Sequence, residues 1–155
     1  MTDYHLPPTL QEYETSITAW LHAFAAENEL FEAIDRGEPG ESAEPRWYVR
    51  LKGEEKEHIT IWFTLGQRTL RYEAYVLPAP AEHVAEVYEL ALRRNDRLVG
   101  AHFAIGVEDA LFLRGELPLT ALNEAELDRI IGSLYQYVES TFPALIRLAF
   151  ASKFA

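Results

Sequence analysis

Two runs of strictly alternating side chains, at residues 58–65 and 70–76, constrain the fold of this chain more than any other feature. In each run every second residue is apolar, which is typical of strands that bury one face in a core. Gly66-Gln67 lies between the runs and predicts a two-residue type II′ hairpin turn. That turn pairs Leu65 with Arg68 and places the apolar residues of both strands on one shared face. The sequence therefore predicts an antiparallel hairpin.

Three further segments show helical periodicity. A capping box at residues 9–12 opens a helix that we expect to reach about Leu30. A second helix is predicted over residues 78–95, with proline in its first turn. Another capping box, at residues 123–126, opens a third helix, which we expect Pro143 to kink or end before the apolar helical pattern resumes. The apolar stripe of the second helix consists of Val84, Val87, Tyr88, Ala91 and Leu92.

The remaining strands are predicted on either side of the second helix. Alternation at residues 47–52 predicts a strand before the hairpin, and alternation at residues 99–105 predicts a strand after the helix. Residues 106–113 hold a turn and the start of a fifth strand, whereas residues 35–45 are acidic, contain Gly and Pro, and form a loop. The order is α-β-β-β-α-β-β-α. It predicts an α+β fold, an antiparallel five-stranded sheet with helices packed on one face.

Length and composition narrow the class of protein. The chain of 155 residues is long enough for one domain, residues 1–155, with its own core. Cysteine is absent, which excludes disulfides and thiolate catalysis and favours a cytoplasmic location. We expect no membrane association, because neither a signal peptide nor a long apolar run is present. The net charge of −11 repels a phosphate backbone, so we expect no nucleic-acid binding.

No catalytic or metal-binding motif stands in the sequence. The five histidines show neither HxxxH nor HxH spacing, so they do not indicate a metal site. No glycine-rich phosphate loop and no GxSxG elbow is present. Glu54 and Glu55 lie together in a turn, where paired carboxylates are common in so acidic a chain. We therefore expect a protein that is not an enzyme and that needs no metal and no cofactor.

The face of the sheet opposite the core carries the residues that indicate a function. In the expected register Trp62 lies opposite Arg71, and the neighbouring strands add further aromatic and arginine side chains. Trp, Tyr and Arg are enriched at the hot spots of protein interfaces. The face as a whole is expected to be more basic than the rest of the chain. The candidate partner-binding residues are Tyr48, Arg50, Trp62, Arg71, Tyr75, His102, Phe112 and Arg114.

Three roles of this face remain open at this point. It can be a solvated surface on which aromatic pairs support the strands. It can be covered by the second helix. It can also be a contact surface for a partner, including a second copy of the chain. Trp62 and Arg71 can form a plain cation–π pair in any of these cases.

Several stretches resemble one bacterial family. They are "WYVRLKGEEKEHITIWFTLGQRTLRYEAYVLPAP", "ALRRND", "FAIGVEDALFLRGELPL" and "NEAELDRIIGSLYQYVESTFPAL". Together they resemble the YbjN-type family, in particular its actinobacterial branch, over nearly the whole chain from Thr9. The resemblance implies a compact α+β domain with a fold like that of type III secretion chaperones. It also implies a homodimer that is chaperone-like or regulates sensory transduction, and it supplies no catalytic residues.

Two functions are consistent with these observations. The leading prediction is a non-enzymatic, chaperone-like protein-binding module of the cytoplasm, homodimeric and with an unknown protein client. It would act by contact alone, in a regulatory role. The alternative is a sensor of a small anionic ligand that uses Arg50, Arg71, Arg114 and His102. The alternative depends on the arginines, because a guanidinium group can donate two hydrogen bonds to one phosphate or carboxylate group.

Overall fold

Six strands form one antiparallel sheet in the structure, a computed structural model that describes residues 6–37 and 44–154. The strands are β1 (Phe31–Arg36), β2 (Arg46–Lys52), β3 (His58–Leu65), β4 (Thr69–Leu77), β5 (His102–Ile105) and β6 (Leu111–Pro118). Their order across the sheet is β1-β2-β3-β4-β6-β5. The α+β class is confirmed, but the prediction of five strands is wrong because it omits β1. The loop predicted at residues 35–45 overlaps β1, and its residues 38–43 lie outside the described residues.

The strand that the sequence pattern missed, β1, pairs with β2 at one edge of the sheet. Its register shifts between Phe31 and Ala33, so its buried and exposed residues do not alternate. Without alternation the sequence carries no strand signal there. The preceding helix, α1 (Leu10–Glu27), ends earlier than predicted. Asn28 closes it, and the N–H of Leu30 donates to the Asn28 side-chain oxygen at 3.0 Å.

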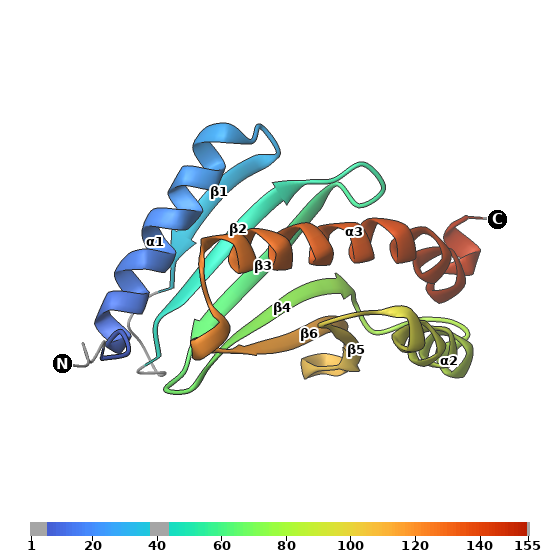
Figure 1. Cartoon of the computed structure of the whole chain (residues 1–155). Helices are drawn as coiled ribbons and strands as arrows, with labels where there is room; N and C mark the ends of the chain where they lie inside the picture. The colour runs from blue at the N-terminus through green and yellow to red at the C-terminus, as the bar shows by residue number, and fades with distance from the viewer. Residues whose placement is uncertain (1–5, 38–43, 155) are drawn as a thin grey trace.

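Two helices, α1 and α3 (Glu124–Ala149), cover the same face of the sheet (Figure 1). Both begin at the predicted caps. The N–H of Glu12 donates to the Thr9 hydroxyl, and the N–H of Glu126 donates to the Asn123 side-chain oxygen. Each cap satisfies a backbone N–H that has no partner within its own helix.

The core fills the space between the sheet and these two helices. Its largest fully buried side chains include Ile17, Leu21, Trp47, Phe63, Leu113 and Leu127. The helix α3 does not end at Pro143, and Leu145 and Ala149 beyond that residue are buried. Proline removes one helical hydrogen bond. The burial of the following turn offsets this loss, so the helix continues.

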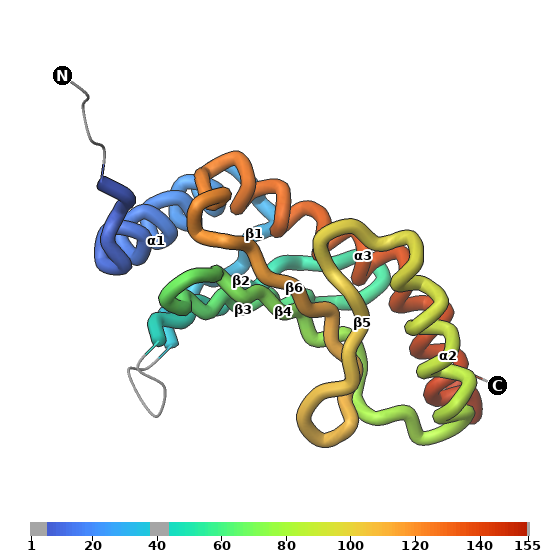
Figure 2. The backbone as a smooth tube through the Cα atoms, turned by 60° about the horizontal axis from the view of Figure 1, so that its bottom comes forward, coloured from blue at the N-terminus to red at the C-terminus, as the bar shows by residue number. Residues whose placement is uncertain are grey.

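The second helix in chain order, α2 (Val84–Arg94), begins later than predicted. It lies beside the last turns of α3, near the β5 end of the sheet (Figure 2). Within its predicted apolar stripe Val87 and Ala91 are buried, whereas Val84 and Leu92 are 45% and 66% exposed. The stripe is only partly covered because α2 packs against α3 and the short strand β5 instead of a broad sheet face.

The hairpin of β3 and β4 has the predicted faces but not the predicted partners. Leu65 pairs with Leu70, and the N–H of Gly66 donates to the carbonyl of Thr69 at 2.9 Å. The connection is therefore longer than the two-residue turn predicted from Gly66-Gln67. A two-residue turn would place Leu65, which is buried, opposite the exposed Arg68, whereas the observed register closes the hairpin with two buried leucines. Since the register differs by two residues, every side chain stays on its predicted face.

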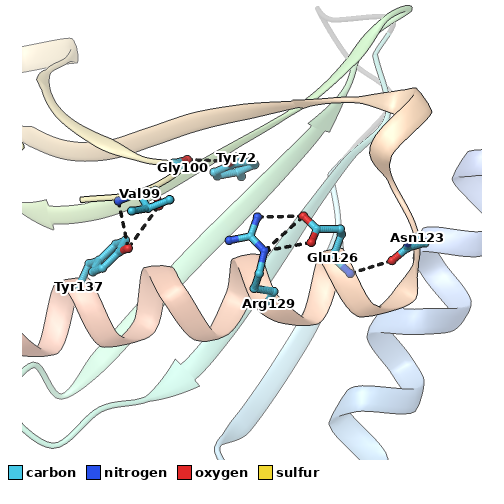
Figure 3. A network of polar contacts seen from close by, with 7 residues as sticks. All are labelled: Tyr72, Val99, Gly100, Asn123, Glu126, Arg129 and Tyr137. Carbon is cyan, nitrogen blue, oxygen red and sulfur yellow. Dashed lines mark hydrogen bonds and ion pairs between the residues drawn. The ribbon is translucent and has the colours of Figure 1, made fainter. Parts of the chain in front are cut away.

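A buried tyrosine of β4 and a half-buried tyrosine of α3 hold the segment that leads into β5 (Figure 3). The Tyr72 hydroxyl donates to the carbonyl of Gly100 at 2.6 Å. The Tyr137 hydroxyl accepts from the N–H of Val99 at 3.1 Å and donates to its carbonyl. At Val99 and Gly100 the backbone groups therefore bond to tyrosine side chains. As a result β5 begins at His102, although alternation predicts a strand from residue 99.

Candidate functional site

The sheet face opposite α1 and α3, here called the open face, carries no helix in the part of the chain that the structure describes (Figures 1 and 2). Arg50 and Arg71 on this face are exposed, and Trp62 and Tyr75 are half-buried. The second helix does not cover it, because α2 packs against α3 and β5. The alternative in which the second helix covers the open face is therefore excluded.

Four aromatic side chains from four strands form a continuous cluster on the open face. The aromatic cluster consists of Tyr48, Trp62, Tyr75 and Phe112. The ring centroids of Tyr48 and Trp62 are 6.4 Å apart, and those of Trp62 and Phe112 are 5.8 Å apart. Tyr75 meets Phe112 edge to face at 5.6 Å. Phe112 is 4% exposed, so it is the buried ring of the cluster, and it contacts both Trp62 and Tyr75. Burial also raises the pKa of Tyr75, which keeps its phenol neutral.

One carboxylate joins the aromatic cluster to an arginine. Trp62 lies opposite Glu73 and not opposite Arg71, so the predicted cross-strand partner is wrong. The indole N–H of Trp62 donates to one oxygen of Glu73, and the Nε of Arg114 donates to the other. The Arg114 guanidinium also lies over the Phe112 ring, with its Cζ atom 4.8 Å from the ring centroid. Arg114, and not Arg71, therefore makes a cation–π contact within the aromatic cluster.

The other two predicted arginines are also ion-paired. The Nε of Arg50 lies 3.2 Å from a carboxylate oxygen of Glu32, and His58 contacts the same oxygen at 3.0 Å. Arg71 donates to Glu44 at 2.9 Å. Each arginine thus faces a carboxylate, and the open face is balanced in charge at these positions. The expectation of a basic face did not include Glu32, because the sequence pattern does not show the strand β1 that contributes it.

The predicted anion site is assembled only in part, because Arg71 and Arg114 line one hollow whereas Arg50 and His102 do not. His102 is exposed and lies opposite Arg114 in the register of β5 and β6. Arg50 and Arg71 belong to β2 and β4 and pair with carboxylates of different segments. The structure therefore joins Tyr48, Trp62, Tyr75, Phe112 and Arg114 by direct contacts, and it leaves Arg50, Arg71 and His102 outside that group.

A polar hollow of about 340 Å³ opens on the same face. Its lining residues are Arg46, Thr64, Arg71, Tyr72, Glu73, Arg114 and Gly115. Arg46 and Thr64 are absent from the predicted site. Alternation does place both residues on the open face, because Arg46 precedes Tyr48 by two residues and Thr64 follows Trp62 by two. They share the open face for that reason.

One end of the open face is fixed by a carboxylate of α3. Glu139 accepts hydrogen bonds from the backbone N–H groups of Glu54, Glu55 and Lys56, at 3.2, 2.7 and 3.4 Å. The Nζ of Lys56 lies 5.4 Å from the centroid of the Tyr75 ring. Burial lowers the pKa of Lys56, and the negative charge of Glu139 opposes that shift. The turn between β2 and β3 is thereby held against the end of the aromatic cluster.

A smaller apolar hollow of about 170 Å³ lies between α2 and β5. It is lined by Tyr88, Ala91, Leu92, Phe103, Ala104, Ile105 and Leu111. The outer edge of β5 beside it is occupied by Asn95, whose side-chain oxygen accepts from the N–H of Phe103 at 2.6 Å. A side chain in that position blocks the pairing of a further strand at this residue.

Within residues 6–37 and 44–154, no three His, Asp or Glu side chains lie close enough together to hold a metal ion. No helix of those residues combines the length and the apolar character that crossing a membrane requires.

Comparison with solved structures finds a distant similarity. The type III secretion chaperone SycH of Yersinia pestis, solved in complex with a stable fragment of YscM2, aligns with 77% of this chain and 94% of its own. The sequence identity is 18% and the TM-score is 0.48. A score of that size supports no inference about partners.

Comparison with curated proteins finds mycobacterial relatives. Uncharacterized proteins of Mycobacterium bovis and Mycobacterium tuberculosis are 37% identical to this chain over 114 residues, which is 74% of this chain and 62% of theirs. An uncharacterized protein of Mycobacterium leprae is 31% identical over 107 residues, 69% of this chain and 58% of its own. The chain therefore spans less than two thirds of the length of these relatives.

A family model provides the identification. The model of the YbjN family, described as "Putative bacterial sensory transduction regulator", matches residues 16–147, which include every strand and most of α1 and α3. The resemblance noted in the sequence is thereby confirmed, and the chain belongs to the YbjN family.

Proposed function

We propose that this chain is a non-enzymatic protein-binding module of the cytoplasm that contacts its partners through the aromatic cluster of the open face. The observation that supports the proposal is the arrangement of the cluster itself. Its outer rings are half-exposed, yet they are held by contacts to one another and to Phe112. Rings that are already ordered lose little conformational entropy when a partner covers them. A role in regulation, as the family description suggests, requires no chemistry beyond such binding.

The proposal includes self-association through the same face. Two copies of a chain with a net charge of −11 repel each other at long range. On the open face, however, Arg50 lies beside Glu32 and Arg114 beside Glu73, so the charge is locally balanced. A surface with an apolar centre and both signs of charge around it can be complementary to itself, as a two-fold interface requires.

The mass of the native particle tests this proposal. Light scattering should give the mass of a dimer for the wild type and of a monomer for Trp62→Glu, which places a charge within the aromatic cluster. Leu92→Glu is the matched control, because Leu92 is an exposed apolar residue of α2 and does not belong to the aromatic cluster. Circular dichroism of both variants shows whether they remain folded.

The possible outcomes separate the two parts of the proposal. A wild-type monomer refutes self-association. A dimer that Leu92→Glu dissociates, and Trp62→Glu does not, places the interface at α2 and refutes the role of the open face in it.

Binding to other proteins is tested by affinity capture with wild type and with Trp62→Glu. The two should retain different sets of proteins, and identical sets would contradict binding through the aromatic cluster.

Recognition of a small anion is a second candidate function. The observation that favours it is the polar hollow, which brings three guanidinium groups to one place on the open face. A volume of about 340 Å³ falls at the lower end of the range for small-ligand pockets.

A further inference from the structure

The polar hollow contains a buried hydroxyl between two arginines. Thr64 is 3% exposed, although it lies on the open face and not in the core. Arg46 pairs with it from β2, and Arg71 pairs with it from β4. Three consecutive strands therefore present guanidinium, hydroxyl and guanidinium in one row across the sheet. Because neighbouring strands lie about 4.8 Å apart, the two guanidinium groups can reach a ligand between them.

The hydrogen bonds of this row leave donors available. The Nε of Arg46 donates to the Thr64 hydroxyl oxygen at 3.1 Å. A threonine that accepts a bond in this way still has its own hydrogen to donate. The two terminal nitrogens of Arg46 have no hydrogen-bond partner among residues 6–37 and 44–154. The row therefore offers N–H and O–H donors toward the hollow, a combination that suits an anion with several oxygens.

The carboxylate that lines the hollow is already satisfied. One oxygen of Glu73 accepts from Trp62 and the other from Arg114. Its charge is thus largely balanced by groups outside the row of Arg46, Thr64 and Arg71. A carboxylate paired in this way repels an incoming anion less than a free one.

A carboxylate already occupies part of the row. Glu44 accepts from the Nη2 of Arg71 at 2.9 Å. This contact demonstrates that an oxyanion can be placed on Arg71, and it also identifies a competitor within the chain. A ligand must offer more than a single carboxylate to displace it. A phosphate group does so, because it carries up to two charges and three oxygens that can accept hydrogen bonds.

We propose that the polar hollow binds the phosphate group of a small molecule, held by Arg46, Arg71 and the Thr64 hydroxyl. This inference rests on the second candidate function and names its ligand class. The phosphate takes the place of Glu44 on Arg71 and receives the free N–H groups of Arg46. The net charge of −11 opposes any anion at long range, so these short-range contacts supply the affinity.

The chain offers a matched control on the same two strands. Arg50 and Thr60 are a cross-strand pair of β2 and β3, as Arg46 and Thr64 are, but they lie outside the hollow. Thr64→Val and Thr60→Val each remove one threonine hydroxyl from β3. Both keep a β-branched side chain that suits a strand. Only the first removes a donor from the proposed site.

The experiment is a titration with inorganic phosphate, followed by NMR signals of the arginine Nε–H groups at constant ionic strength. In the wild type the signals of Arg46 and Arg71 should move with phosphate and not with chloride. Thr64→Val should weaken binding roughly tenfold, the loss of one hydrogen bond to a charged group, and Thr60→Val should not. Glu44→Gln should tighten binding, because it removes the competing charge while the hydroxyl remains.

Three results would overturn the inference. They are unmoved Arg46 signals, equal effects of the two threonine variants, and a Glu44→Gln variant that binds no better than wild type. Glycerol phosphate and vesicles that contain phosphatidic acid identify the source of the phosphate group, and binding to the vesicles alone would refute a small-molecule ligand. The light-scattering test depends on Trp62 and this one on Thr64, so either proposal can fail without the other.

Discussion

Removal of the Glu139 carboxylate should loosen one end of the open face. That carboxylate accepts the backbone N–H groups of Glu54, Glu55 and Lys56. Two further contacts come from α3: the Tyr135 hydroxyl donates to the carbonyl of Lys52 just before the turn, and Lys56 lies over the Phe142 ring. In Glu139→Ala the three donors lose their acceptor together.

The expected magnitude follows from the exposure of the donors. A hydrogen bond to a charged group contributes about 1.5–3 kcal/mol. Glu54 and Glu55 are exposed, so water can replace the carboxylate at their N–H groups, whereas Lys56 is half-buried and its N–H is less accessible. We therefore expect the loss of about one such bond, roughly 2 kcal/mol. In a chain of this length that corresponds to a fall in Tm of roughly 4–8 °C.

Thermal unfolding and amide hydrogen exchange measure this prediction. Exchange at residues 54–56 should accelerate in Glu139→Ala while exchange in the core strands is unchanged. Glu89→Ala is the control, because it also replaces a helical glutamate by alanine, but the carboxylate of Glu89 is paired with the exposed Arg93, at 3.6 Å, and not with a turn. Equal changes in Tm for the two variants would show that the contacts of Glu139 with the turn do not stabilise the fold.

Three further predictions concern the core and its edges. Ile61→Ala should lower the free energy of unfolding by roughly 2–5 kcal/mol. Trp62→Ala should lower it less, because the Trp62 ring is half-exposed. Equal losses in a denaturant titration would mean that both faces of the sheet are buried. Gly115→Ala should destabilise the chain, since the added Cβ would lie 2.4 Å from the carbonyl oxygen of Gly100; an unchanged Tm in calorimetry would contradict this close packing. Burial raises the pKa of Tyr72 above its unfolded value of about 10. The stability that its neutral phenol contributes is therefore complete below pH 10 and is lost as the pH rises through the folded pKa. Tyr72→Phe should reduce this alkaline loss in denaturant titrations between about pH 9 and pH 11, and an identical pH profile would exclude Tyr72 as its source.

Alternation in the sequence predicts faces more reliably than partners. Every candidate residue from β2, β3, β4 and β6 lies on the predicted face of the sheet, because the two-residue period depends only on the strand itself. The partner of Trp62 depends on the length of the turn, and Gly66 is compatible with more than one turn. Burial of Leu70 opposite Leu65 decides the turn, and this requires knowledge of the packed core.

Specific structural features explain why parts of the site could not be predicted from the sequence. Glu32 belongs to a strand whose bulge removes the alternation, so the balance of charge on the open face could not be derived. Glu44 and Glu139 reach their partners through tertiary contacts between segments that are distant in the chain. Arg46 and Thr64 were within reach of the same alternation that selected Tyr48 and Trp62. Only the structure shows that they form a hollow.

Glu73 links the two proposed functions physically. Its carboxylate holds the indole of Trp62 with one oxygen and the guanidinium of Arg114 with the other, and both Glu73 and Arg114 line the polar hollow. A phosphate bound in the hollow would attract Arg114 and weaken its bond to Glu73, and this would change the environment of Trp62. We therefore expect phosphate to alter the fluorescence of the wild type and to leave that of Trp62→Phe unchanged. By linkage, phosphate must then also change the strength of any association through the aromatic cluster. A fluorescence change that persists in Trp62→Phe would come from another tryptophan and would remove the basis for coupling through Glu73.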